Sequence, residues 1–218
     1  LDIQETGMTF QPGDRLAVMT LNNWTECAKV AAALGLDEML DHPVTLNTCW
    51  DRFAQHLGSV SNIPTPQLTV KDILRRGHLA PLGKELVMSL HSLLRASSNT
   101  VLQVLATNEW PVRGSLGDLL QAAVMETSSH IWDQAFDISG NLSWLADLIP
   151  VEVPRTYSIS NSPDELLPST VDLTVSRSNF TLSPIFSDPN STLRHGVGSG
   201  FLNPPVSNQE EFIADDEQ

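Results

Sequence analysis

The stretch that decides the fold is Arg155-Thr156-Tyr157-Ser158-Ile159-Ser160-Asn161-Ser162-Pro163. In an extended strand successive side chains point to opposite faces, so Arg155 and Tyr157 share one face and Thr156 and Ser158 the other. An arginine guanidinium binds phosphate through two parallel hydrogen bonds. A planar ring beside it therefore favours a planar cofactor that carries phosphates. The same pattern also fits an ordinary edge strand with a surface arginine.

The run Arg155–Ser158 resembles the Arg-x-Tyr-Ser flavin motif of ferredoxin reductase-like FAD domains, in particular those of NADPH-dependent diflavin reductases. The resemblance implies FAD as the cofactor, with Arg155 at its pyrophosphate and Tyr157 packed on the flavin. It also implies that Ser158 lies near the N5 edge of the flavin, as the catalytic residue of the site.

A second segment, His195–Leu202, contains three glycines and resembles the phosphate segment of the same family. Glycine allows close approach of the backbone, and amides at a helix start can bind a pyrophosphate. The segment lacks the spacing and the βαβ context of a Rossmann fingerprint. A glycine-rich surface turn is the alternative interpretation, and the extra glycines predict more flexibility than the family pattern has. The candidate phosphate-binding residues are Gly196, Val197, Gly198 and Ser199.

The segment between these two motifs adds one strand and one further candidate. Val171–Arg177 alternates between apolar and polar residues, which predicts a half-exposed strand. Phe180 stands where the resemblance implies an aromatic residue stacked on the adenine of FAD. A core residue at the edge of a barrel explains Phe180 equally well.

The first 150 residues change from strand-like to helical patterns. Ile3–Thr9 and Arg15–Met19 flank a Pro-Gly-Asp turn and predict two strands. Helices are then predicted over 26–34, 50–57, 68–76, 82–96, 99–107 and 116–125, and Trp144–Pro150 closes this mostly helical block. Asn23 or Thr25, Thr69 and Ser115 are the expected helix caps, and Gly35 the expected stop.

Strands on both sides of about a hundred helical residues predict an α+β protein. The layout resembles that of the diflavin reductases, in which a helical connecting region interrupts an antiparallel β-barrel that binds FAD. Residues 1–21 and 150–218 are expected to form the barrel, and residues 22–149 the helical connecting subdomain.

Composition limits the possible partners. The 218 residues include 12 Lys and Arg against 26 Asp and Glu, a net charge of −14, which argues against binding to nucleic acid or to an anionic membrane. No apolar run is long enough for a membrane span, and no signal peptide is visible. The two cysteines and the six histidines have no metal-binding spacing. We therefore expect no metal and a cytoplasmic location.

The resemblance implies a flavoprotein oxidoreductase that relays electrons from NADPH through FAD to an FMN or haem partner. No NADPH-binding domain and no FMN domain are recognisable in this chain, so both are expected on other chains or segments. Two alternatives remain open. One is a degenerate reductase domain that binds an apolar small molecule, either as a binding module or as a cofactor-free cyclase or isomerase. The other is a scaffold domain that contacts a redox partner through its acidic surface.

Overall fold

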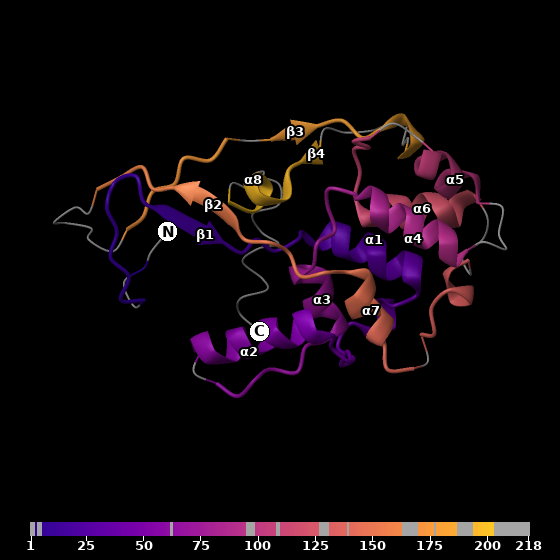
Figure 1. Cartoon of the computed structure of the whole chain (residues 1–218), viewed down its shortest axis with the longest axis horizontal. Helices are drawn as coiled ribbons and strands as arrows, with labels where there is room; N and C mark the ends of the chain where they lie inside the picture. Colours follow the sequence, from indigo (N-terminus) through magenta and orange to yellow (C-terminus); the bar gives the residue numbers. More distant parts are fainter. Residues whose placement is uncertain are drawn as a thin grey trace. The chain divides into compact units, whose positions relative to one another are not determined.

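The computed structural model describes residues 3, 6–61, 63–94, 99–107, 110–126, 131–138, 140–162, 170–176, 178–186 and 194–202. The chain divides into two compact units, each built from segments that are distant in the sequence (Figure 1). The first unit comprises Leu1–Thr20, Val153–Asn179 and His195–Gln218. The second comprises Leu21–Glu152 and Phe180–Arg194.

Within the described residues, the fold is α+β, with short strands and a majority of helices. The strands are β1 (Arg15–Val18), β2 (Arg155–Ser158), β3 (Asn179–Phe180) and β4 (Arg194–His195). The α-helices are α1 (Trp24–Leu34), α2 (Thr48–Ser61), α3 (Val70–Arg76), α4 (Lys84–Leu93), α5 (Thr100–Thr107), α6 (Leu116–Glu126), α7 (Ser143–Leu148) and α8 (Val197–Leu202). Three 3-10 helices are η1 (Asp37–Met39), η2 (Trp132–Gln134) and η3 (Pro184–Phe186).

Helix α1 begins and ends where its sequence predicts. The Asn23 side chain accepts a hydrogen bond of 2.8 Å from the backbone N–H of Glu26, which satisfies one of the unpaired amides of the first turn. Gly35 ends the helix in the left-handed conformation, at φ +68°, and its N–H bonds back to the last turn. These two contacts confirm Asn23 as the cap and Gly35 as the stop.

The predicted caps of α3 and α6 are confirmed as well. Thr69 and Asp72 form a reciprocal capping box, in which each side chain accepts from the backbone amide of the other. Ser115 and Asp118 make the same pair of contacts at the start of α6, at 3.1 and 3.0 Å. Local sequence chemistry therefore determines where these helices begin.

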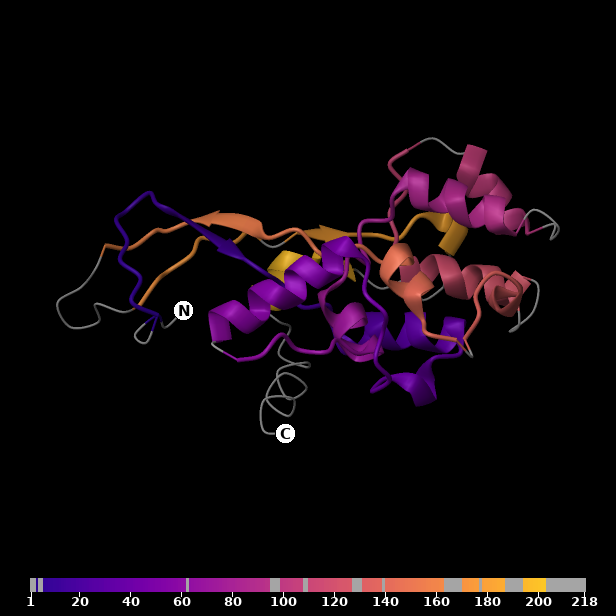
Figure 2. The same ribbon diagram turned by 60° about the horizontal axis from the view of Figure 1, so that its bottom comes forward.

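The helices of the second unit pack around one large apolar core. Two of these helices, α4 and α5, lie side by side (Figure 2). Each helix presents one apolar stripe to this core. Trp50 of α2 is fully buried, and its indole N–H donates to the carbonyl of Ile149 at 2.7 Å. Other large side chains that are almost completely buried include Trp132, Leu34, Leu36, Ile73, Leu74, Leu79, Leu90, Leu102, Leu105, Leu116 and Leu119.

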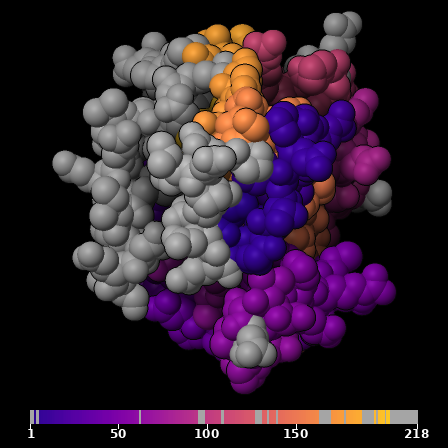
Figure 3. All heavy atoms as spheres, turned by 90° about the vertical axis from the view of Figure 1, so that its left-hand side faces the viewer, coloured from indigo at the N-terminus to yellow at the C-terminus, as the bar shows by residue number. Residues whose placement is uncertain are grey.

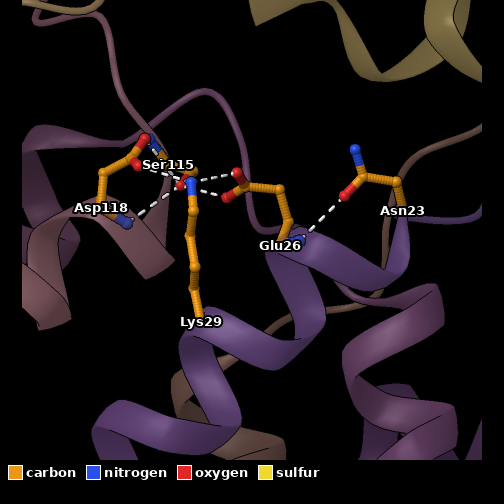
Figure 4. Close-up of polar contacts among 5 residues, drawn as sticks. All are labelled: Asn23, Glu26, Lys29, Ser115 and Asp118. Carbon is orange, nitrogen blue, oxygen red and sulfur yellow. Dashed lines mark hydrogen bonds and ion pairs between the residues drawn. The ribbon is translucent and has the colours of Figure 1, made fainter. Parts of the chain in front are cut away.

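A buried charge network connects α1 to α6 (Figure 4). The Lys29 ammonium lies 2.6 Å from Glu26 and 2.9 Å from Asp118, and all three side chains are mostly buried. The hydroxyl of Ser115 donates to the second oxygen of Glu26 at 2.5 Å. Gly117 allows this approach, because a Cβ there would lie 2.8 Å from the Cβ of Lys29. Such a network is stable only when complete, since loss of one partner leaves a buried charge unpaired.

The first unit is organised around the antiparallel pair of β1 and β2. In its register Leu16 lies opposite Tyr157 and Val18 opposite Arg155. In the space-filling view, indigo atoms of the N-terminal segment lie next to orange atoms of the later part of the chain (Figure 3). A small apolar cluster accompanies the pair; its members are Ile3, Phe10, Ile159 and Val171, with Leu16 and Leu173 packed against them.

Two strand predictions are wrong. Among the described residues of 3–9 the backbone turns instead of extending: Thr6 donates to the carbonyl of Ile3, and Gly7 has φ +68°. The region 171–176 alternates between more and less exposed side chains as predicted. Among the described residues, its pairing nevertheless amounts to an isolated bridge between Leu173 and Ile159, beside a backbone hydrogen bond from Ser160 to Asp172, and it forms no continuous ladder. Alternation indicates a two-sided surface, but a strand also requires a continuous hydrogen-bonded neighbour.

Candidate functional site

The predicted alternation along β2 is confirmed. Arg155 and Tyr157 are half-buried, whereas Thr156 and Ser158 are exposed. Because residues that pair across an antiparallel ladder lie on the same face, Leu16 and Val18 flank the two candidate residues. The guanidinium and the phenol ring thus share one partly apolar surface.

Thr20 is a hydrogen-bond partner of the arginine side chain. Its hydroxyl oxygen accepts a hydrogen bond of 2.8 Å from Nη1 of Arg155. Only 2% of Thr20 is exposed, so this bond lies in a region of reduced water access. The sequence analysis did not identify Thr20 as a site residue. The sequence did contain a signal for Thr20, because this polar residue follows Leu16 and Val18 at the same spacing of two residues.

The glycine-rich segment packs directly onto this face. A Cβ placed on Gly198 would lie 2.4 Å from the hydroxyl of Tyr157 and 2.6 Å from Cδ of Arg155. Only glycine permits so close an approach without moving these side chains. The structure therefore brings together Arg155, Tyr157 and Gly198, three residues that the sequence assigned to one site from two separate motifs.

Side-chain hydrogen bonds attach the beginning of α8 to the segment before β3. The Ser199 hydroxyl accepts from the backbone N–H of Ser178 at 3.1 Å and donates to the carbonyl of Gly196 at 3.3 Å. The amide of Gly196 in turn donates to the carbonyl of Ser178 at 2.8 Å. The Gly196 amide is therefore engaged within the protein, while Val197, Gly198 and Ser199 form the first turn of α8. Ser178 is a second contributor that no sequence pattern indicated.

Of the remaining two candidates, one lies on the opposite face of β2 and the other on β3. Ser158 lies on the exposed face of β2, opposite to the face of Arg155 and Tyr157. Phe180 is half-buried in β3 and packs against the large core of the second unit.

Neither a metal cluster nor an activated buried thiol is found among the described residues. They contain no cluster of His, Cys, Asp or Glu side chains that could hold a metal ion. Cys27 is buried, and this burial raises the pKa of its thiol to about 12, so it stays protonated at neutral pH. None of the described helices has the length and apolarity that crossing a membrane requires.

Comparison with known proteins defines the class. The sequence model of the FAD binding domain family matches residues 1–201, and the chain belongs to this family. Its membership confirms FAD, the cofactor that the two motifs predicted. Among curated proteins, the chain is 26% identical over 223 residues to NADPH–cytochrome P450 reductase of Phanerodontia chrysosporium. That match covers 93% of this chain and 28% of the relative, so the chain spans little more than a quarter of the relative's length.

The local structure fits a flavin dinucleotide. Arg155 supplies a fork of N–H donors suited to a phosphate, and Tyr157 supplies a ring on the same face. The backbone at Gly198 approaches both without an intervening side chain. A cationic fork, an aromatic surface and a glycine backbone are the elements that a phosphate-bearing planar cofactor requires.

Proposed function

We propose that this chain is the FAD-holding part of a diflavin-type, NADPH-dependent oxidoreductase, which relays electrons from NADPH to an FMN or haem partner. The observation that carries the proposal is the convergence of Arg155, Tyr157 and Gly198 on one surface of a chain that belongs to the FAD binding domain family. The similarity to a cytochrome P450 reductase supports the redox assignment. Bound FAD would supply the redox chemistry, accepting hydride and releasing electrons one at a time.

Each residue of the site has a distinct proposed task. Arg155 binds the pyrophosphate through charge-assisted hydrogen bonds, and Tyr157 packs on the flavin ring. The amides of the first turn of α8 add donors for the phosphates, with Gly198 providing the space. Ser158 is proposed to act at the N5 edge of the flavin, which requires the cofactor to extend around the edge of β2. Phe180 is proposed as the contact of the adenine.

We further propose separate tasks for the two domains that the sequence predicts. Residues 1–21 and 150–218 would contribute to a ferredoxin reductase-like barrel, of which the pair of β1 and β2 is the part supported most directly. Residues 22–149 would form the connecting subdomain. Its helical core would set the distance between FAD and the flavin of a partner domain. The NADPH-binding domain and the FMN or haem domain would be supplied by other chains or by segments outside this sequence. The free thiols of Cys27 and Cys49 support a reducing compartment such as the cytoplasm.

The visible absorption spectrum tests this proposal. The purified protein is mixed with excess FAD, desalted and measured against a sample treated with riboflavin. We expect flavin bands that survive desalting with FAD, at a ratio near one flavin per chain, and weaker retention of riboflavin because it lacks the phosphates. A protein that retains neither ligand, at any FAD concentration, contradicts the proposal and leaves the small-molecule alternative as the next candidate.

A further inference from the structure

We propose that Thr20 is a positioning residue of the FAD site, whose hydroxyl holds the Arg155 guanidinium in the orientation that binds the diphosphate. The inference rests on the proposed function and extends it to a residue outside both cofactor motifs. Thr20 does not act on the flavin itself; it acts through Arg155.

The contact has the geometry of a specific and well-placed hydrogen bond. Nη1 of Arg155 lies 2.8 Å from Oγ1 of Thr20, within the range of a charge-assisted N–H···O bond. Thr20 is almost fully buried, and threonine has restricted rotation about χ1 because it is branched at Cβ. The acceptor oxygen is therefore held in place before any ligand arrives.

The position of Thr20 follows from the strand register. Val18 lies directly opposite Arg155, and Thr20 comes two residues later, which makes it a diagonal neighbour of Arg155. Leu16 and Val18 precede Thr20 in the same period-two pattern and offer no polar atom. The threonine hydroxyl thus gives this apolar row a hydrogen-bond acceptor next to the guanidinium.

A fixed guanidinium binds a diphosphate more tightly than a mobile one. Arginine has many rotamers, and ordering its side chain during binding has an entropic cost. A bond to Thr20 that exists before the ligand binds lowers this cost. It also sets the plane of the fork, on which bidentate recognition depends. We expect removal of the acceptor to weaken FAD binding about tenfold, the factor that corresponds to most of one arginine's rotamer entropy.

The alternative explanation is that Arg155 only provides the buried Thr20 hydroxyl with a hydrogen-bond partner, and that this bond has no effect on FAD affinity. A double-mutant cycle separates the two explanations. Thr20→Val removes the acceptor at nearly constant volume, and Thr20→Ser retains it as the conservative control. Both substitutions are made in the wild-type chain and in the Arg155→Ala chain, and FAD affinity is measured by titration with thermal unfolding as a check on folding.

We expect Thr20→Val to raise the Kd for FAD about tenfold in the wild-type background and to leave it unchanged in the Arg155→Ala background. Thr20→Ser should stay close to the wild type. Equal losses in both backgrounds, or no loss in either, overturn the inference while FAD binding by the wild type still supports the proposed function. If Thr20→Val folds poorly, Thr20→Ala gives the same cycle with less crowding. A wild-type chain that binds no FAD overturns the proposed function and the inference together.

Discussion

Replacing Arg155 with alanine should weaken FAD binding more than any other single change on the face of β2. The substitution removes the charge-assisted hydrogen bonds proposed for the diphosphate, and a bond of this kind contributes about 1.5–3 kcal/mol. At about 1.4 kcal/mol for each factor of ten, the Kd should rise roughly 10- to 150-fold. Folding stability should fall separately, because the buried Thr20 hydroxyl loses its bond to Nη1.

Arg52→Ala is the matched control for this experiment. Arg52 carries the same charge, but it is exposed on α2 and belongs to the second unit. Its loss should change the Kd by no more than the general electrostatic effect of one cation. Arg155→Lys should fall between the two, because lysine keeps the charge and loses the planar fork.

Isothermal titration calorimetry with FAD measures all three variants, and thermal unfolding reports their stability. Equal affinities for Arg155→Ala and Arg52→Ala would refute the assignment of Arg155 to the diphosphate. A loss of stability alone, without a change in affinity, would reduce Arg155 to a structural partner of Thr20.

Three further predictions concern packing and thiol chemistry. Gly198→Val should weaken FAD binding and also lower thermal stability, because its Cβ would displace the side chains of Tyr157 and Arg155, whose nearest atoms lie 2.4 and 2.6 Å away, and would disturb the bond between Arg155 and Thr20; unchanged affinity in the same calorimetric titration would argue against the close approach. Gly77→Ala should lower the free energy of unfolding by about 1–3 kcal/mol, since its Cβ would meet a side-chain carbon at 2.2 Å and a backbone oxygen at 2.5 Å. Gly83→Ala, which meets open space, is the control in urea unfolding. Ellman's reagent at pH 8 should titrate one thiol in the native protein, that of exposed Cys49, and two after denaturation; rapid reaction of both would contradict the burial and raised pKa of Cys27.

Helix boundaries were the most predictable part of this fold, because caps are local chemistry. Asn23, Thr69 and Ser115 each bond to an amide three residues ahead, so the sequence alone contains both partners. The stretch 171–177 was less predictable for the opposite reason. Its alternation is real, but a strand depends on a neighbour that is distant in the sequence.

The candidate site shows the same division between local and distant information. That Arg155 and Tyr157 share a face follows from the period of a strand, and the structure confirms it. The close approach of Gly198 and the bond that Arg155 donates to Thr20 join segments separated by about 40 and 135 residues, and no local rule predicts such contacts. Ser158 and Phe180 were grouped with them by resemblance, and their roles remain proposals.

Tyr157 allows the most direct test of the central claim, because it is the single tyrosine of the chain. Protein labelled with 3-fluorotyrosine should give one fluorine resonance, which reports on the proposed flavin surface alone. We predict that FAD shifts this resonance and that the shift saturates at one equivalent per chain. FAD binding that leaves the resonance unchanged, when absorption confirms a bound flavin, would place the cofactor elsewhere and contradict the account.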